Sequence, residues 1–138
     1  MFSKTVVGGT FDGLHEGHKL LLESAFKVSR EILVGLTSDE FAHRFRKTLK
    51  KPYKQRREDL KQYLDGLGKP YEIVEIKDTY GFATIKEDLE AIAVSEETLL
   101  RAQEINTIRY KKNLPKLTII MVPLVTDRQG RPLSSSRD

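Results

Sequence analysis

Five short apolar runs rich in β-branched residues recur along the chain. They occupy residues 4–7, 32–36, 71–76, 91–94 and 117–122. Most are continuous rather than alternating, which is typical of parallel strands buried on both faces. Between them, patterns with helical spacing occupy about residues 17–27, 39–45, 54–67 and 96–112. The alternation of strand and helix patterns predicts successive βαβ units.

The order of these elements sets the fold class. We predict an α/β protein with a Rossmann-like, doubly wound parallel sheet of five strands and helices on both faces. Two of the helices begin with hydroxyl side chains followed by acids, at Thr37-Ser38-Asp39-Glu40 and Ser95-Glu96-Glu97-Thr98, which is typical of capped helix starts. The length of 138 residues and the absence of linkers or repeats fit one domain, residues 1–138.

Composition excludes several classes of site and location. The chain has no cysteine, so it forms neither disulfides nor thiolate metal sites. No apolar run approaches the roughly 18–20 residues that a membrane-spanning helix needs, and the N-terminus has no signal-peptide apolar region. We therefore expect a cytoplasmic protein without a membrane partner.

The charge is uneven along the sequence. Net charge is +4, yet residues 44–61 alone contain nine Lys or Arg against two acids. A local basic stretch on a slightly acidic body indicates a polyanionic ligand. Nucleic acid and a nucleotide or other phosphate ester are both compatible with this charge, and composition does not separate them.

The chemistry-bearing segment follows the first strand. Residues 8–18 read Gly-Gly-Thr-Phe-Asp-Gly-Leu-His-Glu-Gly-His. Ligands of open parallel sheets bind at the carboxyl ends of the strands, and the start of a helix offers N–H groups to an anion. His15 and His18 are three residues apart, so both imidazoles can lie on one side of a first helical turn. The segment predicts a phosphate site, and a metal site is disfavoured because the only further ligands nearby are acids of unknown position.

Two motifs resemble the nucleotidyltransferase superfamily. One is His15-Glu16-Gly17-His18, within residues 8–18, and the other is the late serine-rich segment at residues 133–137. Segments in the middle of the chain, at residues 41–44, 51–56, 94–98 and 105–109, resemble the archaeal and eukaryotic type of phosphopantetheine adenylyltransferase. That resemblance implies transfer of AMP from ATP to 4′-phosphopantetheine by direct in-line attack, giving dephospho-coenzyme A and pyrophosphate. No carboxylate cluster in the sequence indicates a dedicated metal site, so we expect Mg²⁺ to enter bound to ATP and no metal held by protein side chains.

The same resemblance assigns roles to residues. His18 would bind the α-phosphate and stabilise charge in the transition state, His15 would assist along the phosphate chain, and Thr10 would orient the attacking phosphate. The further ligand-binding candidates are Gly8, Gly9, Phe11 and Gly17 around the motif, Lys47, Lys51 and Arg56 in the basic stretch, Ser95 and Glu96 after the fourth strand, Arg109, and Ser134, Ser135, Ser136 and Arg137 in the serine-rich segment.

The chain departs from the family pattern at its end. The family continues past the serine-rich mark with an apolar residue, a second arginine and a helix, whereas here Asp138 is the last residue. We therefore expect the C-terminal helix to be missing and the site for the β- and γ-phosphates to be weakened.

Two alternative functions compete with this interpretation. A related cytidylyltransferase, or an adenylyltransferase that acts on FMN, would share both end motifs. A non-catalytic nucleic-acid-binding protein would use the basic stretch alone. Such proteins interleave aromatic residues with cations, and only Phe45 and Tyr53 do so here, which argues against that class.

Overall fold

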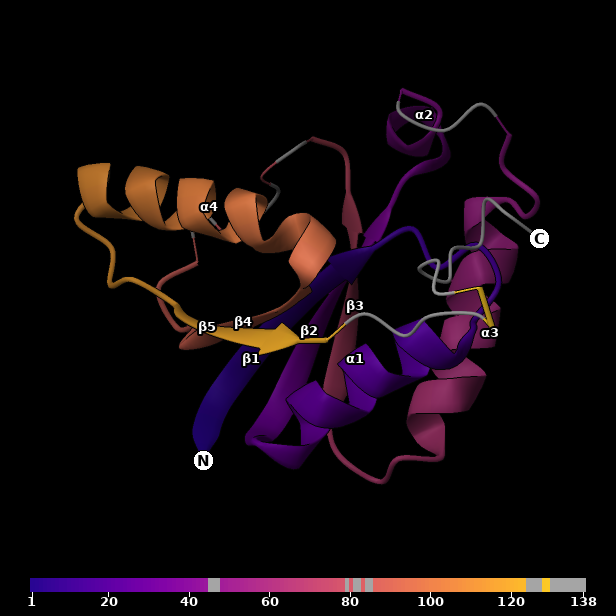
Figure 1. Cartoon of the computed structure of the whole chain (residues 1–138), viewed down its shortest axis with the longest axis horizontal. Helices are drawn as coiled ribbons and strands as arrows, with labels where there is room; N and C mark the ends of the chain where they lie inside the picture. Colours follow the sequence, from indigo (N-terminus) through magenta and orange to yellow (C-terminus); the bar gives the residue numbers. More distant parts are fainter. Residues whose placement is uncertain (45–47, 79, 81–82, 84–85, 124–127, 130–138) are drawn as a thin grey trace.

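A five-stranded, fully parallel sheet forms the centre of the protein. The computed structural model describes residues 1–44, 48–78, 80, 83, 86–123 and 128–129. The strand order is β3-β2-β1-β4-β5 (Figure 1). The elements are β1 (Phe2–Gly9), α1 (Glu16–Lys27), β2 (Ser29–Thr37), α2 (Asp39–Ala42), α3 (Tyr53–Asp65), β3 (Tyr71–Ile76), β4 (Ala91–Ser95), the 3-10 turn η2 (Glu96–Thr98), α4 (Leu99–Lys111) and β5 (Thr118–Val122).

Continuous apolar runs form the central strands because both sheet faces are covered. Successive side chains of a strand point to opposite faces. Val6 accordingly packs on the face of α4, whereas Val7 packs on the face of α1 and α3, and both are buried. β1 pairs with β2 from Phe2 to Gly9 and with β4 on its other side. The predicted Rossmann-like α/β fold is confirmed.

The helices bury their apolar stripes on the two faces of this sheet. On one face, α1 contributes Leu22 and Phe26 to a core that also contains Leu60 and Leu64 of α3. On the other face, Ala102 and Ile105 of α4 pack against β1 and β4 residues. Figure 1 shows α4 on the opposite side of the sheet from α1 and α3. The chain reverses its winding at β1, so the carboxyl ends of β1 and β4 border a crevice.

Several element boundaries differ from those predicted. The predicted helix over 96–112 divides into η2 and α4, which together cover nearly the same residues. The helix predicted over 39–45 ends at Ala42. β1 begins at Phe2 because its first residues still pair with β2, although they carry no apolar run.

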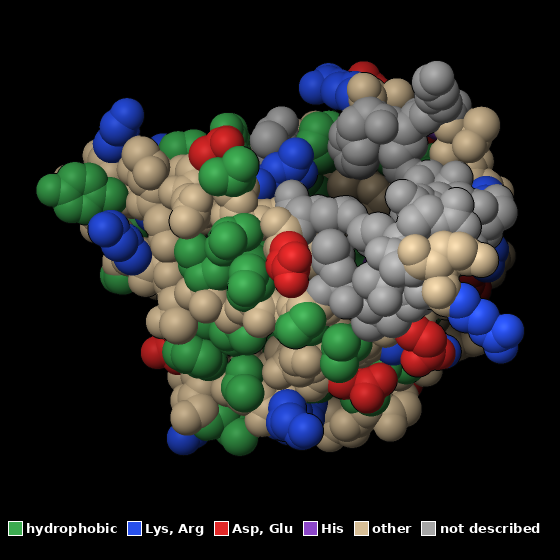
Figure 2. All heavy atoms as spheres, viewed as in Figure 1, with side chains coloured by type: hydrophobic (Ala, Val, Ile, Leu, Met, Phe, Trp, Pro, Cys, Tyr) green, Lys and Arg blue, Asp and Glu red, His purple; other side chains and the backbone are tan. Residues whose placement is uncertain are grey.

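Isolated apolar side chains remain on the surface. Leu100 and Tyr110 of α4 and Met121 of β5 are at least half exposed. Figure 2 shows hydrophobic side chains scattered over this region among charged and polar ones. Such residues are common on protein surfaces and mark no site by themselves. None of the helices in the described part of the chain has the length and apolar character required to cross a bilayer.

Candidate active site

His15 caps the helix that follows the first strand. Its Nδ1 accepts hydrogen bonds from the backbone N–H groups of Gly17 at 3.0 Å and His18 at 3.3 Å. The cap satisfies two donors that a helix start otherwise leaves without an intrahelical acceptor. Since Nδ1 accepts both bonds, the neutral His15 ring carries its hydrogen on Nε2. His15 is thereby fixed as a hydrogen-bond donor at this end of the sheet.

His18 stacks on His15, as their spacing predicts. The ring centroids lie 3.7 Å apart with an interplanar angle of 16°. His18 Nδ1 lies 3.1 Å from Gly13 O and 3.4 Å from His15 N, and these two contacts demand opposite roles of the nitrogen. His18 Nδ1 accepts from the His15 N–H as the second half of a reciprocal cap, and its role towards Gly13 O is set by the tautomer of the ring.

Phe11 fixes the loop between the strand and the helix. Its ring is buried and packs edge-to-face on His18, with centroids 5.1 Å apart. A Cβ on Gly9 would lie 2.9 Å from this ring, so glycine is required there by the protein's own packing. Gly13 adopts a φ of +96°, a conformation that side chains rarely tolerate. The loop therefore presents one defined shape to a ligand.

Thr10 lines a cleft beside this loop. Its Oγ1 accepts a hydrogen bond from Thr37 Oγ1 at 3.0 Å, and the residue is 8% exposed. The cleft has a volume of about 220 Å³ and extends between β1, β2, β4 and α4. Both Gly8 and Gly9 contribute to its lining. The walls are mainly apolar and include Val6, Phe41, Ile92, Val94, Ala102 and Ile105.

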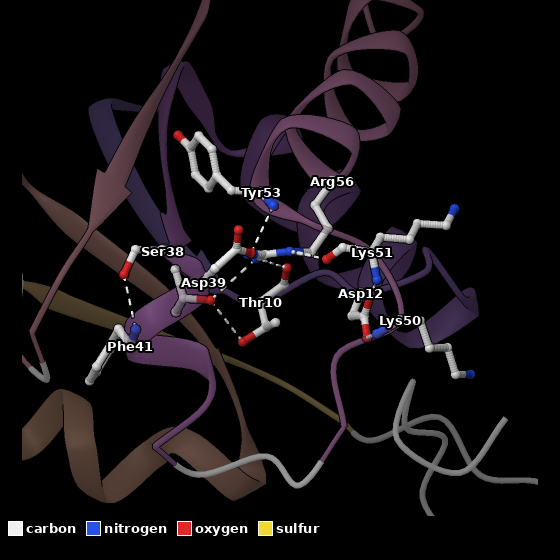
Figure 3. Close-up of polar contacts among 10 residues, drawn as sticks. Thr10, Asp12, Ser38, Asp39, Phe41, Lys50, Lys51, Tyr53 and Arg56 are labelled. Atoms are coloured by element: carbon white, nitrogen blue, oxygen red, sulfur yellow. Dashed lines mark hydrogen bonds and ion pairs between the residues drawn. The ribbon is translucent and has the colours of Figure 1, made fainter.

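Arg56 requires a correction of the predicted phosphate clamp. Its side chain is fully buried on the inner face of α3 and has no surface from which to contact a ligand. Nε donates to Lys51 O at 3.0 Å, one terminal nitrogen donates to Thr10 O at 2.9 Å, and the other forms an ion pair with Asp39 at 2.8 Å (Figure 3). Arg56 thus joins the end of β1, the start of α2 and the start of α3.

Asp12 connects the motif loop to the basic stretch. Its carboxylate is 1% exposed and accepts hydrogen bonds from the backbone N–H groups of Lys50 at 2.7 Å and Lys51 at 2.9 Å (Figure 3). These bonds hold the backbone of Lys51 beside the motif loop. The Lys51 ammonium pairs with Asp59 at 2.8 Å, and this contact, with a second one from Gln55, lowers the pKa of the Asp59 carboxyl.

The remaining predicted residues fall in three places. Ser95 and Glu96 lie at the carboxyl end of β4, where Ser95 caps η2 through a reciprocal contact with Thr98. Arg109 needs the second correction, because its buried guanidinium donates to the carbonyls of Ala83 and Lys86 instead of reaching towards the motif. Burial lowers the pKa of Arg109. The predictions for Lys47, Ser134, Ser135, Ser136 and Arg137 lie outside the described residues.

Sequence reasoning missed several residues that build the site. Asp12 is part of the quoted motif, but nothing local predicts that it holds a segment 38 residues away. Thr37 was identified only as part of a helix start, and the structure adds its contact with Thr10. The burial of Arg56 had a signal, since residues 56, 60 and 64 share one face of α3 and the other two are leucines.

Comparison with known proteins places this geometry in a family. The chain is 45% identical over 133 residues to a bifunctional phosphopantetheine adenylyltransferase/NTP phosphatase of Thermoplasma volcanium, covering 96% of the chain but only 40% of that protein. It is 44% identical over 139 residues to a phosphopantetheine adenylyltransferase of Pyrococcus horikoshii, covering 98% of the chain and 87% of that protein.

One solved structure resembles the chain in fold, and one family model matches nearly its whole sequence. A crystal structure of an Archaeoglobus fulgidus protein of unknown function is 35% identical, with a TM-score of 0.80 over 95% of this chain and 99% of that one. The model of the cytidylyltransferase-like family matches residues 6–137, which include the motif, the cleft and the basic stretch. The chain therefore belongs to the cytidylyltransferase-like family, in which its relatives include archaeal phosphopantetheine adenylyltransferases.

Proposed function

We propose that the protein is a phosphopantetheine adenylyltransferase. It transfers AMP from ATP to 4′-phosphopantetheine and releases dephospho-coenzyme A and pyrophosphate, a step of coenzyme A biosynthesis. The observation that carries this proposal is the junction of two unlike surfaces at the carboxyl ends of β1 and β4. A stacked histidine pair at a helix start is suited to phosphates, and Thr10, in the same motif loop, lines a mainly apolar cleft of about 220 Å³.

The histidine pair suits in-line phosphoryl transfer. An oxygen of the acceptor phosphate forms a bond to the α-phosphorus of ATP, the bond from that phosphorus to the bridging oxygen breaks, and its electron pair leaves with pyrophosphate. Such a reaction depends on positioning and on charge stabilisation rather than on a covalent intermediate with the enzyme. His18 would bind the α-phosphate and stabilise charge there, and neutral His15 would donate from Nε2 along the phosphate chain.

The cleft suits the acceptor's arm. Phosphopantetheine carries a phosphate on a long, uncharged arm, and most walls of the cleft are uncharged and apolar. Thr10 lies where the arm would meet the phosphate, and the polar residues Thr98 and Arg101 line the other side. A mainly apolar pocket with a few placed polar groups is the usual form of a small-molecule site.

The basic stretch and the metal complete the proposal. The Asp12 carboxylate holds the backbone of Lys50 and Lys51 against the motif loop, which keeps positive charge near the phosphates. We expect Mg²⁺ to arrive with ATP, held by phosphate oxygens and water. Among the described residues, no three or more His, Asp or Glu are grouped so that they could hold a metal ion. We also propose a cytoplasmic location, where ATP is available.

Removal of the His18 ring tests the proposed function. His18→Ala is expected to lower kcat for dephospho-coenzyme A formation by about 10²–10³-fold, the usual effect of losing one transition-state donor. His43→Ala is the matched control, because His43 is exposed at the end of α2. Circular dichroism checks that both variants fold. Turnover of His18→Ala within a few-fold of the parent would contradict the proposed role of the pair.

A further inference from the structure

A chain of hydrogen bonds runs from the buried Arg56 to the hydroxyl of Thr10, which lines the cleft. An Arg56 terminal nitrogen lies 3.4 Å from Thr37 Oγ1, and Thr37 Oγ1 donates to Thr10 Oγ1 at 3.0 Å. Thr37 is 5% exposed and Thr10 is 8% exposed, so water has little access to either hydroxyl. All three groups are therefore oriented by one another and by the protein.

The chemistry of arginine gives this chain a direction. A guanidinium has only donors and stays protonated, so Thr37 Oγ1 acts as the acceptor towards Arg56. The single hydrogen of Thr37 is then used on Thr10 Oγ1. Because Thr10 Oγ1 receives that hydrogen, its own hydrogen is left to donate to another acceptor. Thr10 lines the cleft, so that acceptor can be a ligand oxygen.

Arg56 is itself held in place from three sides. It pairs with Asp39 at 2.8 Å, donates to Lys51 O at 3.0 Å and donates to the Thr10 carbonyl at 2.9 Å. Figure 3 shows the guanidinium lying between Thr10, Asp39 and Lys51. Arg56 therefore acts on Thr10 twice. It binds the Thr10 carbonyl directly, and it orients the Thr10 hydroxyl through Thr37. Arg56 thus controls both the position and the hydrogen-bond direction of Thr10.

We infer that Arg56 and Thr37 are positioning residues for the acceptor, and that the chain Arg56–Thr37–Thr10 makes the Thr10 hydroxyl a fixed donor to an oxygen of the acceptor phosphate. The inference rests on the proposed function. Arg56 has no exposed surface, and Thr37, which lines the cleft beside Thr10, is inferred to act through the Thr10 hydroxyl. A fixed donor costs no reorientation when the acceptor arrives, whereas a hydroxyl that points elsewhere must first turn. The chain should therefore support binding of the acceptor phosphate and have little effect on binding of ATP.

The test removes the middle hydroxyl of the chain. Thr37→Val keeps the shape of the side chain and is expected to lower kcat/KM for 4′-phosphopantetheine about tenfold, as for one lost hydrogen bond, with the KM for ATP within twofold. Thr37→Ser restores the hydroxyl and should restore activity. In a Thr10→Val background, Thr37→Val should add less than about twofold, because the chain then has no end group to orient.

A matched control separates orientation from general loss of a buried hydroxyl. Thr5 is also buried in β1, and its hydroxyl contacts that of Ser29, away from the cleft. Thr5→Val should reduce thermal stability while leaving kcat/KM for the acceptor within twofold. A Thr37→Val enzyme that matches the parent, or that loses as much activity in the Thr10→Val background as in the parent, would overturn the inference while transfer itself stands.

Calorimetric titration keeps the inference testable if turnover fails. Absence of dephospho-coenzyme A with the parent chain would contradict the proposed function. Binding of 4′-phosphopantetheine to the parent and to Thr37→Val would then decide the role of the chain. Weaker binding by the variant, with ATP binding unchanged, supports it. Equal binding by both, or no binding by the parent, overturns it.

Discussion

Two buried arginines show how similar side chains serve different regions of this protein. Arg56 and Arg109 are both fully buried, and both donate to backbone carbonyls. Arg56 also has an ion-pair partner, Asp39, and a hydroxyl partner, Thr37. The structure gives Arg109 carbonyl partners only, at Ala83, Lys86 and Pro115, and one of its terminal nitrogens is buried without an acceptor among the described residues.

The difference lies in what each arginine holds. Arg56 connects to Thr10, which the proposed mechanism places at the acceptor phosphate. Arg109 donates to the backbone carbonyls of Ala83 and Lys86. Of these two residues, only Ala83 lines the cleft. The first arginine should therefore affect the chemical step, whereas the second should affect stability and the fit of the acceptor's arm.

The largest effect that distinguishes the two arginines is expected at Arg56. Arg56→Lys keeps the charge but loses the fork that reaches Thr10 and Thr37. Hydrogen bonds from charged groups contribute about 1.5–3 kcal/mol, so kcat/KM for the acceptor should fall about 10- to 100-fold. Steady-state kinetics well below the unfolding temperature measure this. Arg57→Lys, on the exposed side of α3, is the control and should remain near the parent.

A smaller and different effect is expected at Arg109. Arg109→Lys should lower the free energy of unfolding by about 1–3 kcal/mol, because buried carbonyls lose their donor. The KM for 4′-phosphopantetheine should rise a few-fold, since Ala83 lines the cleft, while kcat stays unchanged. Urea unfolding and steady-state kinetics give both values. A fall in kcat as large as that of Arg56→Lys would remove the distinction between the two arginines.

The smallest effect is expected where charge is exposed. Asp59→Asn releases the Lys51 ammonium and should tighten ATP binding about twofold at low salt, with a stability change below about 0.5 kcal/mol. The gain should disappear at high salt because exposed charges are screened. Titration calorimetry at two ionic strengths measures it. Unchanged affinity at low salt would show that Lys51 does not act on the nucleotide.

The lowered pKa of Asp59 sets the pH dependence of this pair. A carboxyl whose pKa is lowered by folding contributes stability above its unfolded value, here 3.8, and loses it as the pH falls through the folded value. Parent and Asp59→Asn should therefore differ in stability at neutral pH and converge in acid.

The sequence predicted the scaffold well and the internal contacts poorly. Apolar runs such as 32–36 and 91–94 identified the central strands, because parallel strands buried on both faces have a local signature, and the run at 71–76 forms the partly exposed edge strand β3. The histidine pair was also local, since three-residue spacing at a helix start determines that the rings can meet. The fold and the motif therefore followed from short stretches of sequence.

The roles of individual cations depended on distant partners. Arg56 was one of nine cations in its stretch, and although its spacing with Leu60 and Leu64 signalled burial, its partners Asp39 and the Thr10 carbonyl come from distant parts of the chain. Arg109 shares the inner face of α4 with Ala102 and Ile105, so its burial was visible in the helical spacing. The sequence did not predict its carbonyl partners at residues 83 and 86, because they lie in a segment more than 20 residues away along the chain.

The most direct test of the account is the identity of the product. Purified protein is incubated with Mg²⁺ and ATP and with 4′-phosphopantetheine, glycerol 3-phosphate or FMN in parallel, and the products are read by mass spectrometry. The account predicts dephospho-coenzyme A and pyrophosphate in the first reaction and no adenylylated acceptor in the other two. No product from 4′-phosphopantetheine, or an adenylylated product from either other acceptor, would contradict it.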